Sequence, residues 1–325
     1  RRRQGDRAMS IPYVALPEAR YGEAQQVAPL VRRVLAKNPS KYTAIGTGTY
    51  IVGRGEVAVI DPGPTIGSHR EALAAALEGE TVTAILVTHC HSDHSPLAAW
   101  LRERTGAPTV CVGPHVVDPT WVDDDDAPSE TDPDEPPPEE EQGEEGHDLA
   151  FEPDRRVADG DLAASGDGWT MRAVHTPGHT SNHTCYYLEE QRALFTGDHI
   201  MGWSTSVITP PDGDMRSYLA SLAKVQALDP ATLWPTHGAP VTDVAPFVQA
   251  FIAHRLEREA NVLAAVRDGE ALIPDIVRRL YVGVPEKLYR AAGRSVLSHL
   301  IKLVQDGLVT FDGTQPGVKT PYSPT

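Results

Sequence analysis

Residues 88–94 have the sequence Thr-His-Cys-His-Ser-Asp-His, which is the most informative stretch of the chain. It follows an apolar run at residues 83–87, Thr-Ala-Ile-Leu-Val, which predicts a buried strand. Alternate side chains of an extended chain share a face, so His89 and His91 should point the same way. Asp93 and His94 lie beyond the end of the predicted strand, so their side chains can turn toward a second binding centre. This density of donor groups at one strand tip favours a bound cation over a solvated polar loop.

His179, Asp198 and His237 each follow a short run of residues that predicts a strand. A lone histidine in such a place is more often an ordinary hydrogen-bonding group than a ligand. The ordered series HxHxDH, then His, Asp and His, is far more specific than any one of its members. His175 fits an ordinary strand histidine better than a ligand, and Cys90 is expected to fill the core.

These motifs resemble those of the metallo-β-lactamase superfamily, and within it the glyoxalase II-like hydrolases. The resemblance covers roughly residues 40–245 and includes all five usual motifs, the first of which is Asp61 after the strand-like residues 57–60. It implies that Asp61 orients the histidine cluster. It also implies a two-metal site for which every ligand is present: His89, His91 and His179 on metal 1, Asp93, His94 and His237 on metal 2, and Asp198 between them.

Within the superfamily, the chain is similar to the lactamase-β-like endoribonuclease group. Residues 46–50, 179–183 and 202–206 carry this similarity, together with the C-terminal extension. Two features depart from the group: Gly48 stands where asparagine is common, and His199 follows the bridging aspartate.

The resemblance implies a hydrolase in which a dinuclear metal-bound hydroxide attacks an ester, thioester or lactam. Two divalent ions are the expected cofactors. Imidazole and carboxylate ligands suit zinc, and iron and manganese stay open. Asp93 and His183 are the expected catalytic residues, Asp93 as the carboxylate that handles protons and His183 as a supporting or substrate-contacting group. Tyr50, Trp203, Ser204 and Thr205 are candidate lining residues.

Three alternatives remain open. An endoribonuclease would use the same metal pair on single-stranded RNA, although Arg172 is the one basic residue beside a metal motif. A mononuclear iron sulfur dioxygenase would leave His94 and His237 without a metal. A non-catalytic nucleic-acid-binding protein would rest on the C-terminal extension alone.

Length and composition set the wider limits. A chain of 325 residues predicts one large domain and one small one. Three scattered cysteines favour a reducing compartment, and the expected location is the cytoplasm. No run of residues has the length and apolarity of a membrane span. The expected partner is a small-molecule substrate, with RNA as the alternative, no membrane contact and a homodimer as a further candidate. Met9 is a candidate start of the natural chain.

The net charge of −16 comes almost entirely from one segment. Residues 118–148 hold 15 aspartates and glutamates and no lysine or arginine, so the rest of the chain is close to neutral. Such a segment cannot bury enough apolar surface to fold alone. We interpret it as an inserted surface loop that aids solubility, rather than an acidic flap that repels polyanions or binds cations. Deletion of residues 123–146 should leave the fold and the metal content unchanged.

Strands and helices alternate along the chain, which predicts an α/β (α+β) fold: the four-layer αββα metallo-β-lactamase sandwich, followed by a small helical winged-helix domain. The predicted strands are 49–53, 56–60, 83–88, 108–112, 169–175, 184–188, 193–196, 232–234 and 308–311. The predicted helices are 25–36, 68–78, 95–105, 214–228, 247–266, 273–281 and 286–306. The predicted domains are an N-terminal extension at 1–22, a catalytic domain at 23–245 and a C-terminal domain at 246–325. The C-terminal domain is expected to bind nucleic acid, to pack beside the active site or to form a dimer contact.

Overall fold

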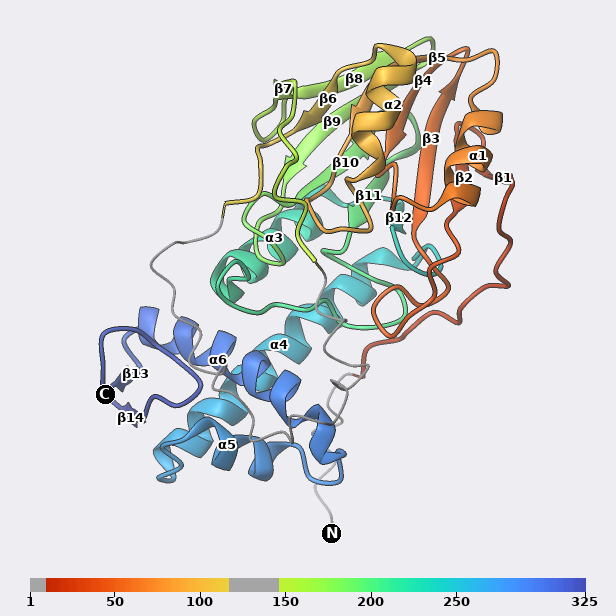
Figure 1. The fold of residues 1–325 in the computed structure, drawn as a ribbon. Coiled ribbons are helices and arrows are strands. Elements are labelled where there is room, and N and C mark those ends of the chain that lie inside the picture. Colours follow the sequence, from red (N-terminus) through yellow and green to blue (C-terminus); the bar gives the residue numbers. More distant parts are fainter. Residues whose placement is uncertain (1–9, 117–145) are drawn as a thin grey trace, which may run out of the picture.

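A computed structural model of the chain describes residues 10–116 and 146–325. Two β-sheets pack face to face with helices on their outer sides, and a helical unit lies at one end of this sandwich (Figure 1). The predicted fold class, an αββα sandwich with a C-terminal winged-helix domain, is therefore confirmed. The predicted acidic loop lies outside the described residues, apart from residues 146–148.

The first sheet has seven strands in sequence order. The strands β1 to β4 form an antiparallel meander, and β5, β6 and β7 then add in parallel. The parallel strands are connected by helices α1 (Gly67–Ala76) and α2 (Leu97–Thr105). The strands are β1 (Ala24–Ala28), β2 (Val31–Leu35), β3 (Gly48–Arg54), β4 (Glu56–Ile60), β5 (Thr81–Leu86), β6 (Thr109–Cys111) and β7 (Arg155–Arg156).

The second sheet has five strands in the order β12-β11-β10-β9-β8. Its pairs are antiparallel except β11 with β12, which run in parallel around helix α3 (Met215–Leu228). Asp214 caps this helix as predicted, because its side chain accepts a hydrogen bond from the Ser217 amide. The strands are β8 (Leu162–Gly166), β9 (Trp169–His175), β10 (Thr184–Leu188), β11 (Ala193–Gly197) and β12 (Thr232–Pro235).

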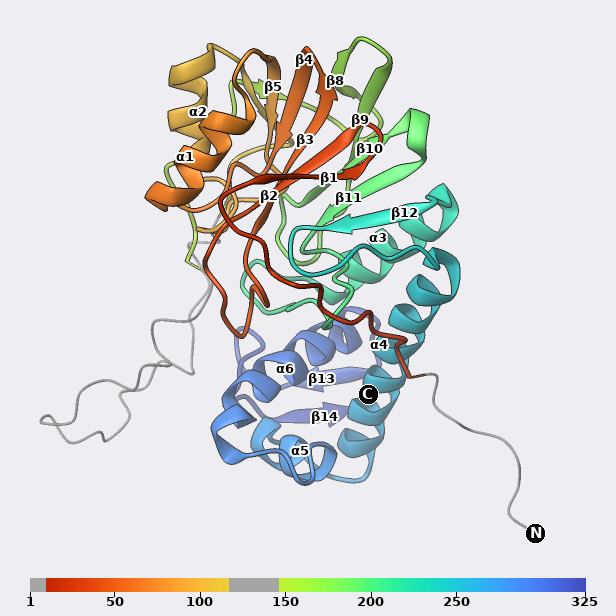
Figure 2. The same cartoon turned by 90° about the vertical axis from the view of Figure 1, so that its right-hand side faces the viewer.

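Apolar side chains from both sheets fill the space between them, among them Tyr50, Trp169 and Phe195. Helices α1 and α2 cover the outer face of the first sheet, and α3 lies on the outer side of the second (Figure 2). Central strands such as β3, β4 and β11 are thus buried on both faces, which is why they read as nearly continuous apolar runs.

The helix predicted at residues 25–36 was wrong, because this segment is the β1–β2 hairpin. Pro29 lies in the tight turn between the strands, and a proline inside a helix would cost about 3 kcal/mol. Val31 and Val34 are both fully buried, one on each face of the first sheet. This two-sided burial stabilises a strand over the helix that the local pattern favoured. Strands β7, β8 and β14 were not predicted either.

The C-terminal unit consists of α4 (Val244–Arg267), α5 (Ile273–Leu280), α6 (Tyr289–Gln305) and the antiparallel pair β13 (Val309–Phe311) and β14 (Tyr322–Pro324). The unit has its own apolar core, and α4 spans from the sandwich into it (Figures 1 and 2). Arg216 on α3 donates hydrogen bonds to Gln305 and Asp306 at the end of α6. In the described parts of the chain, no helix combines the length and apolarity needed to cross a bilayer.

Candidate metal centre

All the predicted ligand residues lie at the ends of strands that finish at the same edge of the sandwich. β5 leads into residues 88–94, and the parallel strands β11 and β12 lead into Asp198 and His237. His179 lies in the loop between β9 and β10. Ligand-type atoms within 4.8 Å of one another form three overlapping groups here: His89, His91 and His179; His89, His94 and Asp198; Asp93, His94 and His237.

The first group is a tight set of imidazoles. The His91 Nδ1 atom lies 2.9 Å from His89 Nε2 and 3.2 Å from His179 Nε2. All three rings are buried, and His179 Nδ1 is 2.6 Å from the carbonyl oxygen of Val207, which sets the orientation of its ring.

The second group combines two imidazoles with two carboxylates. His237 Nε2 lies 3.2 Å from Asp93 Oδ2 and 3.5 Å from Asp198 Oδ1. His94 Nε2 lies 3.4 Å from Asp93 Oδ1 and 3.7 Å from the same Asp198 oxygen. Asp198 therefore reaches the histidines of the second group and, through His89, those of the first.

Three atoms at this point are buried and have no hydrogen-bond partner: His94 Nε2, His237 Nε2 and Asp198 Oδ1. Buried polar atoms are nearly always paired, so an unpaired set that converges on one point calls for a missing partner. Two imidazole nitrogens and a carboxylate oxygen are typical ligands of a divalent cation. The residues present therefore fit a metal site.

The pKa values of these side chains show the same demand for positive charge. Burial by itself would lower the pKa of His237, but the carboxylates of Asp198 and Asp93 raise it to about 10. Burial likewise opposes the charged form of His94, yet Asp93 and Asp198 hold its pKa well above the usual value. His89 lies among other imidazoles, and burial together with these neighbours lowers its pKa well below the usual value.

Asp61 lies behind the cluster, in contact with His94 and with the residue before His89, where the resemblance implied an orienting aspartate. Its buried carboxylate accepts hydrogen bonds from the Thr88 amide at 2.8 Å, the Thr88 hydroxyl at 2.8 Å and the Thr236 hydroxyl at 3.0 Å. It also lies 2.9 Å from His94 Nδ1, which turns His94 Nε2 toward the centre. The backbone of Asp61 has a φ of 48°, a left-handed conformation that aspartate and asparagine tolerate.

Two supporting residues were missed from the sequence. Thr47 donates a hydrogen bond of 2.7 Å to Asp93 Oδ2, and the Gly-Thr-Gly-Thr stretch that contains it was noted but given no role. Arg33 is buried, and its guanidinium donates to the carbonyl oxygen of Gly238 at 2.9 Å, next to His237. Arg33 gave no usable signal, because its segment was predicted to be a helix.

His183 lies behind the cluster rather than at its surface. The side chain is completely buried, its Nδ1 is 2.9 Å from the Thr176 hydroxyl, and its Nε2 accepts the amide of Asp198 at 3.3 Å. Of the two roles considered for His183, this position favours support of Asp198 over contact with a substrate.

Three other residues singled out in the sequence lie in the interior. His199 is fully buried edge-on against Tyr218, and burial first, then His179, lowers its pKa to about 3. Tyr50 is also buried, and its hydroxyl donates to the Pro235 carbonyl, so its prediction as a lining residue was wrong. Cys90 is buried, as expected of core filler.

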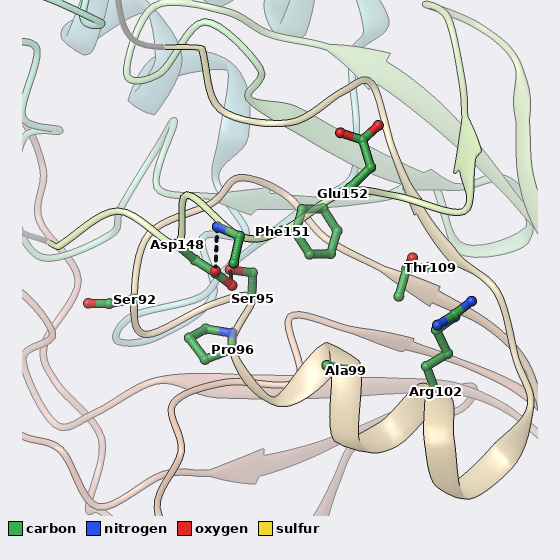
Figure 3. A pocket seen from close by; sticks show the side chains of 10 residues that line it. Ser92, Ser95, Pro96, Ala99, Arg102, Thr109, Asp148, Phe151 and Glu152 are labelled. Atoms are coloured by element: carbon green, nitrogen blue, oxygen red, sulfur yellow. Dashed lines mark hydrogen bonds between the residues drawn. The ribbon is translucent and has the colours of Figure 1, made fainter.

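A cavity of about 520 Å³ lies beside helix α2, on the outer side of the motif. Ser95 and Asp148 point toward one another in its wall and form a 2.7 Å hydrogen bond (Figure 3). None of the seven ligand-type side chains lines this cavity, which meets the motif at Ser92 and the residue after the motif at Ser95.

Comparison with known proteins agrees with this geometry. Residues 44–237 match the family model of the metallo-beta-lactamase superfamily, and residues 273–317 match that of the beta-lactamase associated winged helix domain. The lactamase-like protein adaB of Aspergillus niger is 30% identical over 312 residues, which cover 90% of this chain and 86% of that protein. An atrochrysone carboxyl ACP thioesterase of Pseudocercospora fijiensis is 31% identical over 316 residues, covering 92% and 81%.

Among solved structures, a beta-lactamase domain protein from Burkholderia ambifaria superposes with a TM-score of 0.71 at 20% identity and covers 94% of both chains. This likeness concerns the fold. The match of the family model to more than half of the sequence decides the assignment: the protein belongs to the metallo-beta-lactamase superfamily, carries the associated winged helix domain at its C-terminal end, and is a hydrolase.

Proposed function

We propose that this protein hydrolyses thioesters at a dinuclear metal centre, with zinc as the first candidate for both ions. His89, His91 and His179 would hold one ion, and Asp93, His94 and His237 would hold the other, with Asp198 shared. The observation that carries the proposal is a set of three buried atoms, on His94, His237 and Asp198, that have no hydrogen-bond partner and converge on one point. When bound, such ions supply a nucleophilic water at neutral pH and polarise a carbonyl oxygen.

The residues of the chain have distinct parts in this proposal. The Asp93 side chain is 16% exposed and that of Asp198 only 1%, so Asp93 is the carboxylate that water and substrate can reach. The Thr47 hydroxyl donates to Asp93 Oδ2 and so holds in place the carboxylate that we expect to handle protons. Buried His183 accepts the Asp198 amide and so fixes the main chain from which this carboxylate projects.

A thioester is supported by the names of two relatives and by the local charge. Besides the Pseudocercospora protein, an atrochrysone carboxyl ACP thioesterase of Aspergillus chevalieri is 29% identical over 313 residues. A phosphodiester would need free cationic groups near the metals. Arg33 instead donates to a backbone carbonyl beside His237, and Arg172 pairs with Glu189 on the exposed side of β9. An uncharged acyl carbonyl suits these surroundings better than a polyanion.

The test compares zinc-loaded and chelator-treated protein on four substrates: an acyl-N-acetylcysteamine thioester, the matching oxygen ester, a chromogenic lactam and labelled single-stranded RNA. We expect thioester cleavage, measured by thiol release, to depend on the metal. Asp198→Asn and His237→Gln should lower kcat/KM by more than the roughly 100-fold that loss of a ligand-supporting residue costs. His175→Gln, at a partly exposed histidine outside the centre, should leave the rate unchanged.

Two outcomes would overturn the proposal. Metal-dependent RNA cleavage without thioester cleavage would make the protein a ribonuclease. One iron per chain in the as-purified protein, with no hydrolysis of any substrate, would favour the mononuclear oxygenase.

A further inference from the structure

A second cluster of ligand-type side chains lies outside the centre described above. It consists of His115, His147 and Asp212, whose donor atoms all lie within 4.8 Å of one another. His115 follows β6, His147 precedes β7, and Asp212 lies in the loop before α3. None of the three was predicted to have a role.

His115 and Asp212 form the buried part of the cluster. Their side chains are only 2% and 8% exposed, and His115 Nδ1 lies 3.2 Å from Asp212 Oδ2. Both atoms are buried, and neither has a partner in good hydrogen-bond geometry. Two ligand atoms on a tetrahedral zinc ion, each about 2.0–2.2 Å from the metal, lie about 3.3–3.5 Å apart. The observed separation is close to that value, so an ion could bind between them with little rearrangement.

His147 supplies the third donor from the solvent side. Its ring stacks on that of His115, with 4.0 Å between the ring centroids and 26° between the planes. The residue is exposed, so an ion could enter from this side and keep a water as its fourth ligand.

The main chain holds the two buried donors in place. Asp212 Oδ1 accepts the Ser181 amide at 2.9 Å, which leaves Oδ2 to face His115. Asn182 donates from its side chain to the Gly113 carbonyl at 3.0 Å, two residues before His115. Ligands that are fixed in this way by a second layer of hydrogen bonds are typical of built metal sites.

We propose that His115, His147 and Asp212 form an additional binding site for a divalent transition-metal ion of the zinc class. Two imidazoles and one carboxylate are a common donor set for such ions. His147 pairs with His91 across an isolated β-bridge, and Asp212 is bonded to the loop that carries His179. An ion here would fasten the chain on both sides of residues 117–145 to the main centre and so stabilise the folded state.

The test measures zinc bound per chain. Chelator-stripped full-length protein is dialysed against a series of buffered zinc concentrations, and bound zinc is measured by mass spectrometry. The variants are Asp212→Asn, which keeps the acceptor for the Ser181 amide but replaces the facing oxygen, and His147→Gln, at an exposed position that tolerates the change. His175→Gln is the control, because glutamine there can still donate to the Ser181 carbonyl that now faces His175 Nε2 at 3.2 Å.

We expect Asp212→Asn to bind one zinc ion fewer than the unaltered protein, and His147→Gln to weaken that one site at least about tenfold. The control should bind as many ions as the unaltered protein. Equal zinc binding by Asp212→Asn, His147→Gln and the unaltered protein would overturn the proposal. The readout is a difference between variants, so it is separate from the main centre: failure of the dinuclear proposal would lower all totals together and leave the difference intact.

Discussion

The substitution Asp61→Asn tests whether the buried carboxylate behind the metal centre organises it. Asp61 receives four hydrogen bonds, from the Thr88 amide and hydroxyl, the Thr236 hydroxyl and His94 Nδ1. Asparagine has the same shape and tolerates the left-handed backbone of this position, so the main chain is not strained. The asparagine side chain can accept hydrogen bonds through one oxygen only. Its NH2 group would then face at least one of the four donors, and no hydrogen bond could form there.

The expected size of the effect follows from these contacts. Removal of one partner from a buried charged pair costs about 3–5 kcal/mol, because the other group keeps its desolvation cost. We therefore expect metal-free Asp61→Asn to lose about 3–5 kcal/mol of unfolding free energy. Zinc affinity should fall about 10–100-fold, as is typical when a group that orients a metal-bound histidine is lost.

The assays are urea denaturation of the metal-free protein and competition for zinc with a chromophoric chelator. Asp154→Asn is the matched control, since Asp154 likewise accepts from the amide and hydroxyl of one threonine, Thr109, and pairs with a cation, Arg102. The Asp154 side chain is 29% exposed and belongs to none of the ligand groups, so the loss of stability should be smaller and zinc affinity should not change. Zinc affinity of Asp61→Asn equal to that of the unaltered protein would refute the orienting role.

Three further predictions follow from single contacts. A Cβ on Gly178, which has a φ of +140°, would lie 2.4 Å from the α3 backbone. The free energy of unfolding of Gly178→Ala should therefore be about 1–3 kcal/mol lower than that of Gly168→Ala, since Gly168 also has a positive φ but has open space around it. Equal denaturation midpoints would contradict this. Arg33→Met should lower the free energy of unfolding by about 1.5–3 kcal/mol and weaken zinc binding. Arg32→Met, at the adjacent and more exposed arginine, should leave zinc binding intact. Equal zinc affinities of the two variants would contradict a supporting role of Arg33. Zinc binding at pH 7 should release about two protons per chain. The raised pKa values of His94 and His237 keep both imidazoles protonated until the metal displaces their protons. Binding should therefore strengthen as the pH rises, and calorimetry in buffers of different ionisation enthalpy would show no release if this is wrong.

Much of the sandwich could be predicted because its signals are local. The runs that became β3, β4, β9 and β10 are apolar over the length of a strand and end at turn residues, so each could be read without its neighbours. The domain boundaries stay predictions. Helix α4 begins at Val244 and therefore runs across the boundary that was predicted between residues 245 and 246. The β1–β2 hairpin could not be recognised in this way, because burial on both faces of the first sheet gives Val31 and Val34 their strand conformation.

The candidate ligands could be named from the sequence alone, because the HxHxDH motif and the single histidines and aspartate after it have few other uses in this order. Tertiary structure alone decided how they are supported. His237 Nδ1 lies 3.1 Å from the carbonyl of Gly46, 191 residues earlier, and Thr236 bonds to Asp61 across 175 residues. The tertiary structure also places His115 next to Asp212. Such contacts depend on how the two sheets are packed face to face, and no local pattern of residues encodes that distance or direction.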